Sequence, residues 1–440
     1  MNLVKGKIIR LPGERDAVLD TLDAAIYDTL KRDVLDVDLV INACDTLSKA
    51  IGQEHVDLLV GAGIPARKAK DYLREAKSQL SRENLVKRLR TEIGTECFSE
   101  KTRVSDESSN SCIKERIMPW GTLLHIAAGN QLGLAFYSVI EGLLTGNINI
   151  VKLPSGDNGL SAMIFLELLK IEPQLKDYIY LFDYTSKETE ALQKLMTVAE
   201  AIVVWGGDEA VQAVRNVAGP STKIIEWGHK LSFAYATPKG YNEQTLYGLA
   251  ENIVETNQML CSSCQGIFLD TDSMEDVYRF CETFLPVLDR CRLDYDEDIP
   301  LEIQAQTGLM VYTESLQASY RPCKVYRGEC SSLLAYEDSF LETAIPYGNC
   351  WVKRLPRQKL IHTLRLHKNH LQTAGLLCDV EEKQQLTELL WKAGVTRVTQ
   401  GKNMSRTYNG AAHDGEYGLR RYTRVVSQEF LDCQERKQTT

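Results

Sequence analysis

Cys261 stands in a segment whose composition suits a catalytic thiol. The stretch NQMLCSSCQGIFLD begins at Asn257, and two serines follow the cysteine before an apolar run that we expect to form a strand at Gly266–Leu269. A nucleophilic thiol requires a partly open place among small side chains, where its pKa can fall and a substrate can approach. The segment therefore offers Cys261 as a nucleophile, although one ordinary buried thiol among 12 cysteines fits the same pattern.

Cys261 and Cys264 also form a C-x-x-C pair, which allows a redox interpretation. Redox pairs of this kind usually open a helix directly after a strand, whereas this pair precedes an expected strand. A single C-x-x-C is also only half of a zinc site, and the sequence contains no matching second pair. The redox and zinc interpretations therefore rank below the nucleophile.

Glu226 and Asn130 lie where expected strands meet turns, the part of an α/β sheet that lines a ligand crevice. Glu226 ends the run KIIE and precedes Trp-Gly, so it is either a functional carboxylate or a solvated strand end. The side-chain amide of Asn130, in AAGNQLG, can donate to a developing oxyanion. The same amide can instead cap the following helix.

Four further positions suit a dinucleotide. Lys152 ends the run NINIVK, where a lysine can reach a ribose hydroxyl or a phosphate. A carboxylate at position 155 would repel a 2′-phosphate, whereas Ser155 accepts one, so this residue favours NADP(H) over NAD(H). Gly206 and Gly207 join the run AIVVW to a helical DEAVQAVRNV and let the backbone approach a pyrophosphate, although they do not form the G-x-G-x-x-G fingerprint.

The elements that must position these residues follow two patterns, a helical N-terminal region and then alternating strands and helices. Residues 14–95 have the apolar periodicity of helices, including runs at 37–51 and 67–90, and residues 95–112 are polar and aperiodic. Strands and helices then alternate, as in a parallel sheet with helices on both faces. The expected strands are 123–126, 148–152, 178–182, 201–204 and 223–225, and the expected helices are 132–144, 160–170 and 186–196.

A second α/β block is expected from residue 233 onwards. Its strand candidates are Gly266–Leu269, Gly308–Val311 and Trp351–Leu355, and a last strand is expected at Tyr422–Val426. The fold class is therefore α/β, with a Rossmann-type nucleotide domain followed by a second α/β domain.

Composition excludes several classes of protein. The 440 residues carry a net charge of −9, which argues against a nucleic-acid partner. The N-terminal residues lack an apolar signal region, and the apolar stretches are shorter than the roughly 18 residues that a membrane helix needs. We therefore expect a cytoplasmic protein with free thiols. His362, His367 and His370 have basic neighbours and no nearby carboxylates, so they indicate a basic surface or phosphate-contacting stretch and argue against a metal site.

Taken together, these segments resemble the aldehyde dehydrogenase superfamily, and within it the LuxC-type acyl-CoA reductases. The similar pieces, in family order, are PWGTLLHIAAGNQ, NINIVKLPSGDN, VVWGGDEAV, IIEWGHKLSFAYA, NQMLCSSCQ and HDGEYGLRRYTRVV, and they span about three-quarters of the chain. The resemblance implies that Cys261 is the nucleophile and that Glu226 occupies the general-base position, 261 − 226 = 35 residues before it. It also assigns Gly228 of EWGHK to the cofactor site.

One departure from the superfamily pattern concerns the reaction. Asn257 and Gln258 precede Cys261 by four and three residues, where aldehyde oxidisers have glycine-glutamine two residues before the nucleophile. This arrangement is similar to the CoA-acylating branch, many of whose members lack the general-base glutamate. The resemblance thus implies NADPH-dependent reduction of an acyl-CoA, or another acyl thioester, to an aldehyde, with NADH as a possible substitute. Asn130 and the Cys261 backbone N–H would hold the oxyanion.

The resemblance also implies a domain layout and partners. Residues 1–105 would be the helical part of the cofactor domain, 119–232 its Rossmann-type part and 233–415 the catalytic domain. Residues 106–118 and 416–440 would form an oligomerisation hairpin and strand, so we expect a homo-oligomer. An acyl-protein synthetase partner is also implied. An NAD(P)-dependent aldehyde oxidiser that uses Glu226 as its base, or a catalytically silent acyl-binding scaffold, stays open as an alternative.

Overall fold

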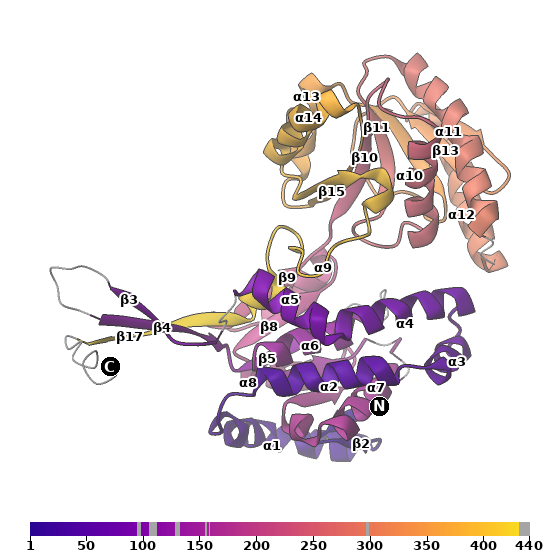
Figure 1. The fold of residues 1–440 in the computed structure, drawn as a ribbon. Coiled ribbons are helices and arrows are strands. Elements are labelled where there is room, and N and C mark those ends of the chain that lie inside the picture. Colours follow the sequence, from indigo (N-terminus) through magenta and orange to yellow (C-terminus); the bar gives the residue numbers. More distant parts are fainter. Residues whose placement is uncertain are drawn as a thin grey trace. The chain divides into compact units, whose positions relative to one another are not determined.

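The chain forms two compact units. The computed structural model describes residues 1–94, 98–104, 112–127, 133–154, 156–157, 159–295 and 299–430. Met1–Gly228 and Tyr408–Thr440 form unit 1, and His229–Thr407 form unit 2 (Figure 1). The sequence-based boundaries at 232/233 and 415/416 lie close to these divisions. Both ends of the chain therefore contribute to unit 1.

Unit 1 is built on a seven-stranded sheet in the order β2-β1-β7-β6-β5-β8-β9. Strands β5 to β9 are mutually parallel, and β1 and β2 add an antiparallel edge. The strands are β1 (Asn2–Val4), β2 (Lys7–Ile9), β5 (Thr122–Ile126), β6 (Ile148–Lys152), β7 (Ile179–Phe182), β8 (Ala201–Trp205) and β9 (Lys223–Trp227). The order reverses between β5 and β8, and such a switch point opens a ligand crevice at the carboxyl ends of the strands.

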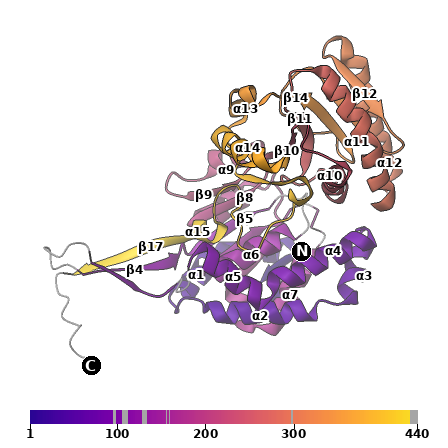
Figure 2. The ribbon, with the colours of Figure 1, turned by 45° about the horizontal axis from the view of Figure 1, so that its top comes forward.

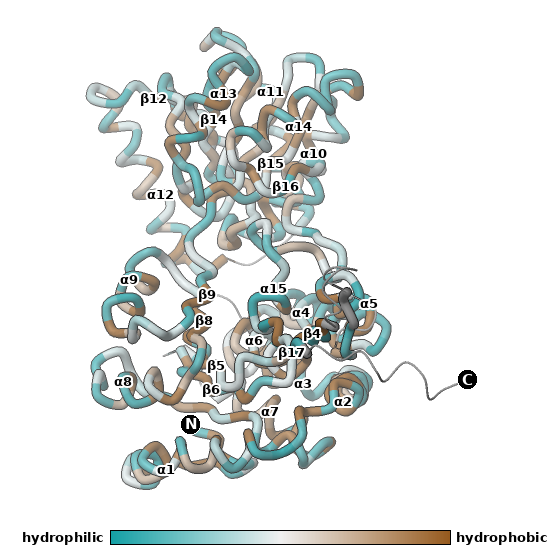
Figure 3. Tube along the Cα trace, turned by 90° about the vertical axis from the view of Figure 1, so that its left-hand side faces the viewer, coloured by the Kyte–Doolittle hydropathy of each residue, from teal (hydrophilic) through white to brown (hydrophobic). Residues whose placement is uncertain are grey.

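Helices cover the sheet of unit 1, as the sequence predicts. They are α1 (Pro12–Leu30), α2 (Val37–Ala50), α3 (Gln53–Gly61), α4 (Ala66–Leu80), α5 (Arg82–Glu92), α6 (Leu134–Leu144), α7 (Leu160–Ile171), α8 (Thr189–Val198), α9 (Asp208–Val217) and α15 (Gly418–Arg421). Figure 3 shows α1 and α5 changing between hydrophilic and hydrophobic residues along their turns. This pattern is expected of helices that bury one face.

A buried histidine lies in the middle of this sheet. His125 of β5 is fully buried, and its ring nitrogens lie 2.7 Å from Ser138 Oγ and 3.0 Å from Asn149 Oδ1. Burial lowers the pKa of His125 to about 4. The ring is therefore neutral at pH 7, and its two polar neighbours replace the water that it loses.

Three strands form a separate small sheet in unit 1. Strand β4 (Cys112–Pro119) lies between β3 (Lys101–Val104) and β17 (Thr423–Phe430), and all neighbours are antiparallel. β17 pairs with β4 along its whole length, from Thr423 opposite Pro119 to Phe430 opposite Cys112. Figure 1 shows β3, β4 and β17 as an elongated ribbon. The strand predicted at Tyr422–Val426 is thus present, one residue later and longer.

Unit 2 holds a second seven-stranded sheet in the order β12-β13-β14-β11-β10-β15-β16. All neighbours are parallel except β12 and β13. The strands are β10 (Leu231–Ala236), β11 (Cys264–Leu269), β12 (Cys323–Arg327), β13 (Ser332–Tyr336), β14 (Asn349–Arg354), β15 (Leu371–Leu377) and β16 (Arg397–Gln400). The helices are α10 (Glu243–Thr256), α11 (Met274–Tyr295), α12 (Leu301–Leu316), α13 (Arg357–Leu364) and α14 (Val380–Ala393).

Alternate side chains of β10 pack in two different hydrophobic clusters. Ala234 and Ala236 pack in the cluster that contains side chains of α10 and α11. Phe233 and Tyr235 pack in the cluster that contains side chains of α13 and α14. Because successive side chains of a strand point to opposite faces, this division shows helices on both faces of the sheet (Figure 2). The expected fold class is confirmed.

One predicted strand is wrong. Gly308–Val311 lies inside helix α12 and forms no strand. The run Gly-Leu-Met-Val reads as a strand in isolation, yet the residues buried on this helix are Thr307 and Val311, four positions apart. That spacing places both on one side of a helix. Among the described residues, no helix is both long enough and apolar enough to span a membrane.

Candidate active site

Cys261 lies in the turn that joins α10 to β11. Helix α10 ends at Thr256, and the next two residues, Asn257 (φ 47°) and Gln258 (φ 63°), adopt left-handed backbone conformations. Such conformations are costly for residues other than glycine and persist where the surroundings hold them. The turn brings Cys261 to the amino end of β11, where the cysteine is exposed.

Hydrogen bonds hold the left-handed residues in place. The amide of Gln258 donates to Cys264 O (3.2 Å), and its Oε1 accepts from Gly348 N (3.0 Å). Gln265 Nε2 donates to Gln258 O at 3.0 Å. Cys264 N donates to Asn252 Oδ1 at 3.1 Å, which ties β11 back to α10. These hydrogen bonds therefore pre-organise the turn that carries Cys261.

Two strands contact Cys261 directly. Gln372 Nε2, from β15, donates to Cys261 Sγ at 3.2 Å. Ser232 Oγ, from β10, donates to Cys261 O at 2.7 Å and accepts from Thr373 N at 3.0 Å. The sulfur and the carbonyl of the same residue are thus held from one side of the sheet.

The second cysteine of the C-x-x-C pair has a different environment. Cys264 is fully buried as the first residue of β11, and its thiol donates to Gly266 O. Burial raises the pKa of Cys264 to about 12, so this thiol is protonated at neutral pH. Neither Cys261 nor Cys264 forms a disulfide in the structure. A protonated, enclosed thiol is a poor nucleophile, which favours Cys261 over the pair as the reactive unit.

Glu226 is held by arginines in unit 1. Its carboxylate, on β9, forms an ion pair of 2.6 Å with Arg215 of α9, and its carbonyl accepts from Arg421 at 2.9 Å. The carboxylate of Glu226 thus links the end of β9 to α9.

The candidate cofactor residues lie at the carboxyl ends of the parallel strands of unit 1. Lys152 is the last residue of β6, and partial burial lowers the pKa of its amine. Gly206 follows β8, and Gly207 is the cap residue of α9. A Cβ added at Gly207 would meet nothing within 4 Å, so the backbone is open there. Gly228 follows β9, and a Cβ there would also meet nothing.

Two predicted site residues are not placed. Asn130 and Ser155 lie outside the described residues. Gly206 and Gly207 also have acidic neighbours, because the first turn of α9 carries Asp208 and Glu209. Negative side chains at a helix N-terminus interact with the same backbone N–H groups that would hold a phosphate. Asp208 and Glu209 therefore compete with a phosphate for the N-terminus of α9.

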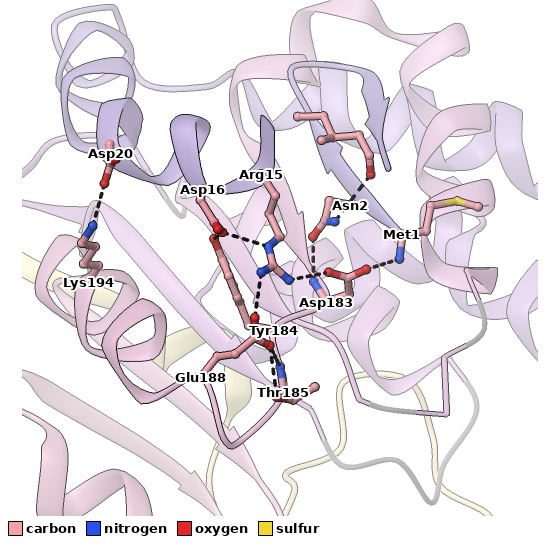
Figure 4. A network of polar contacts seen from close by, with 11 residues as sticks. Met1, Asn2, Arg15, Asp16, Asp20, Asp183, Tyr184, Thr185, Glu188 and Lys194 are labelled. Carbon is pink, nitrogen blue, oxygen red and sulfur yellow. Dashed lines mark hydrogen bonds and ion pairs between the residues drawn. The ribbon is translucent and has the colours of Figure 1, made fainter. Parts of the chain in front are cut away.

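A cluster of charges that the sequence analysis missed surrounds the end of β7. Arg15 of α1 forms ion pairs with Asp183 (3.3 Å) and Glu188 (2.7 Å) and lies over the ring of Tyr184 at 3.9 Å (Figure 4). β7 pairs with β6 up to Lys152, so this cluster adjoins the expected ribose site. Arg15 is occupied by its carboxylates, which leaves Lys152 as the candidate cation for a phosphate.

Aromatic residues from three of the resembling segments meet in unit 1. Trp205 ends β8 and Trp227 ends β9, and their rings stack with centroids 5.2 Å apart. His413 packs on both, at 5.6 and 5.0 Å, and Arg421 lies 4.4 Å from the ring of Trp227. The C-terminal segment thus covers the carboxyl ends of β8 and β9. Sequence patterns gave no signal that these rings stack.

A match to a known protein family shows to which family the chain belongs. The family described as acyl-CoA reductase (LuxC) matches residues 34–425. The chain belongs to the LuxC family. The resemblance expected from the sequence is therefore confirmed.

Relatives of this LuxC chain share modest identity. The long-chain acyl-protein thioester reductase 2 of Photobacterium leiognathi is 23% identical over 329 residues, a match that covers 71% of this chain and 65% of that protein. The chain thus covers less than two thirds of the length of the first curated relatives that it matches.

Solved structures confirm the fold. Aldehyde dehydrogenase 21 from Physcomitrella patens superposes with a TM-score of 0.72 at 13% identity, covering 96% of this chain and 91% of that one. The glyceraldehyde-3-phosphate dehydrogenase GapN from Methanocaldococcus jannaschii, complexed with NADP, gives a TM-score of 0.70 at 16% identity and covers 98% of each chain. The LuxC chain has the aldehyde dehydrogenase fold.

Proposed function

We propose that this LuxC-family chain reduces an acyl thioester, with NADPH, to the corresponding aldehyde through a covalent thioester on Cys261. The observation that carries the proposal is the exposed Cys261 thiol in a pre-organised turn, with an amide donor 3.2 Å from its sulfur. The names of the curated relatives favour a long-chain acyl group.

The residues of the chain supply the acyl-transfer half of the reaction. The Cys261 thiolate attacks the acyl carbonyl carbon, and the thiol of the donor leaves as the thioester to Cys261 forms. The backbone N–H of Cys261 and the amide of Asn130 would donate to the oxyanion. When bound, NADPH supplies a hydride to the acyl carbon. Cys261 then departs as the thiolate while the carbonyl of the aldehyde re-forms. The sum is acyl thioester + NADPH + H⁺ → aldehyde + thiol + NADP⁺.

We assign the cofactor to the carboxyl end of the unit 1 sheet. The switch between β5 and β8 supports this assignment, since ligands of doubly wound sheets bind at such points. Gly206, Gly207 and Gly228 would lie against the dinucleotide, and Lys152 with Ser155 would hold the adenosine ribose and its 2′-phosphate. Ser155 is the residue that supports NADPH over NADH.

Glu226 would position this site without acting as the base for hydrolysis. Its ion pair with Arg215 supports this role, because a base must give up such a pair before it can accept a proton. A reductase has no water to activate, since reduction and not hydrolysis releases the acyl group from Cys261.

The acyl donor and partners are also proposals. The names of the relatives support an acyl group carried on a protein, and acyl-CoA offers the same thioester chemistry. An acyl-protein synthetase would then be the partner that delivers the acyl group. β17, which pairs with β4 on one side, would offer its other edge to a second copy of the chain.

Single-turnover oxidation of NADPH with a panel of acyl-CoAs and acyl-proteins tests the proposal. The native protein should oxidise NADPH and release one thiol for each aldehyde formed, and Cys261→Ala should do neither. Cys378→Ala, which removes a half-buried thiol elsewhere in unit 2, should behave as the native protein does. Oxidation that persists in Cys261→Ala would refute the covalent route. Reduction of NADP⁺ by an aldehyde without any thiol acceptor would favour the aldehyde oxidiser instead.

A further inference from the structure

The strand that carries Gln372 is irregular beside Cys261. Along β10 and β15, Leu231 pairs with Leu371 but Phe233 pairs with Ala374, so β15 contains one more residue than β10 over this interval. The neighbouring pair shows the same feature, since Ser232 pairs with Cys264 and Ala234 with Ile267. Both neighbours of β10 therefore carry a β-bulge at this end of the strand, β15 opposite Ser232 and β11 opposite Phe233. Bulges of this kind occur next to active sites, where they redirect a side chain.

The bulge brings Gln372 to the sulfur. Gln372 is almost fully buried, yet its Nε2 reaches the exposed Cys261 Sγ at 3.2 Å. Its carbonyl accepts from Thr396 N and from Thr396 Oγ1, both at 3.1 Å, which fixes the backbone of β15 at this residue. A buried amide on a fixed backbone is a rigid donor, unlike an exposed side chain with free rotamers.

We propose that Gln372 is a further catalytic residue, which stabilises the Cys261 thiolate by donating its side-chain amide to the sulfur. An N–H donor favours the charged form of its acceptor and so lowers the pKa of the thiol. The thiolate is the form that attacks a thioester, and it is also the leaving group when the aldehyde departs. The same donor therefore assists both the formation and the breakage of the Cys261 thioester. The inference deepens the proposed function and rests on it.

Alkylation of Cys261 as a function of pH tests the inference without substrate or cofactor. Iodoacetamide reacts with the thiolate alone, so the pH at the midpoint of the alkylation rate reports the pKa of the thiol. Mass spectrometry of the Cys261 peptide separates this thiol from the other cysteines. Gln372→Met keeps the length of the side chain but removes the donor, and it should raise the midpoint by about one pH unit.

A second variant and a control make the result specific. Gln372→Glu places a carboxylate beside the sulfur, so it should raise the midpoint at least as far as Gln372→Met does. Gln385→Met, on the exposed side of α14, should leave the midpoint unchanged. Each variant is first checked for native unfolding behaviour, and if Gln372→Met fails to fold, Gln372→Glu decides.

Folded Gln372 variants with the native midpoint would overturn the inference. A native protein that oxidises no NADPH with any acyl thioester, but whose midpoint still rises in the Gln372 variants, would refute the proposed function and leave the contact established. In an active reductase, Gln372→Met should also slow the single-turnover rate at pH 7 and recover part of it at higher pH, where more of the thiol is ionised. Slowing that is equal at all pH values would count against the inference.

Discussion

Arg215 and Glu226 join α9 to β9 through an ion pair of 2.6 Å, at the position where the superfamily pattern puts a general base. The carboxylate of Glu226 is engaged by the guanidinium of Arg215, and its carbonyl accepts from Arg421. Substitution of Glu226 therefore separates a positioning role from a role as a base.

Glu226→Gln should therefore lower the rate of acyl-thioester reduction by less than about tenfold, whereas loss of a true general base costs about 10²- to 10⁴-fold. The measurement is single-turnover NADPH oxidation at saturating acyl-CoA. Glu209→Gln, in the first turn of α9, is the control for removing one carboxylate from the same helix. A loss of 100-fold or more in Glu226→Gln alone would restore the glutamate as a base.

Ser155→Glu should weaken NADPH binding by at least about tenfold and change NADH binding far less, because only NADPH brings a 2′-phosphate to a new negative charge. Titration of the nicotinamide fluorescence measures both dissociation constants. Ser221→Glu adds the same charge before β9, at the opposite end of the sheet, and should alter neither. Equal losses for both cofactors would show that Ser155 does not discriminate between them.

His125 should make the protein less stable as the pH falls from about 6.5 to 4. Its pKa is about 4 in the folded chain and 6.5 when exposed, so the unfolded state binds a proton over this interval that the folded state refuses. The free energy of unfolding should be about 3 kcal/mol lower at pH 4 than above pH 6.5, because each unit of pKa difference contributes about 1.36 kcal/mol.

Urea unfolding of the native protein and of His125→Gln between pH 7 and 4 measures this contribution. As the pH falls, the free energy of unfolding should decrease more steeply for the native protein than for the variant. The difference in slope should correspond to the uptake of about one proton on unfolding. Parallel curves would mean that the ring accepts its proton inside the folded sheet.

Val425→Glu should dissociate the proposed homo-oligomer without unfolding the chain. Val425 lies on β17, pairs with Ile117 of β4 and is 65% exposed, so a charge costs little in the isolated chain. Sedimentation velocity should show a smaller species for the variant. Val60→Glu, which charges an exposed valine of α3, should keep the native size. An unchanged size in Val425→Glu would move the interface away from this strand.

The alternation of strands and helices could be predicted from the sequence alone. Central parallel strands are short, continuously apolar runs, and the helices between them have apolar residues at helical spacing. Lys152 was correctly placed at the end of β6. Gly308–Val311 was misassigned because four residues cannot distinguish a buried strand from one turn of a helix.

Gln372 and Ser232 could not be assigned to the site, although each is a polar residue in a mostly apolar strand. Their contacts with Cys261 depend on bulges that shift the register by one residue, and register is a property of paired strands. The partner of Glu226 was hidden for a similar reason. Arg215 reaches it only because α9 packs beside β9.

Unit 1 contains segments from both ends of the chain, and this has a consequence for synthesis on the ribosome. Tyr422 is completely buried in unit 1, and its carbonyl accepts from Asn147 Nδ2 at 3.0 Å. Residues 1–228 therefore emerge long before the side chain that completes their core. Unit 2, whose residues 229–407 are contiguous, can close first during translation. A chain that stops before Tyr422 would lack a side chain that fills the core of unit 1, and the resulting cavity would lower the stability of the unit that is synthesised first.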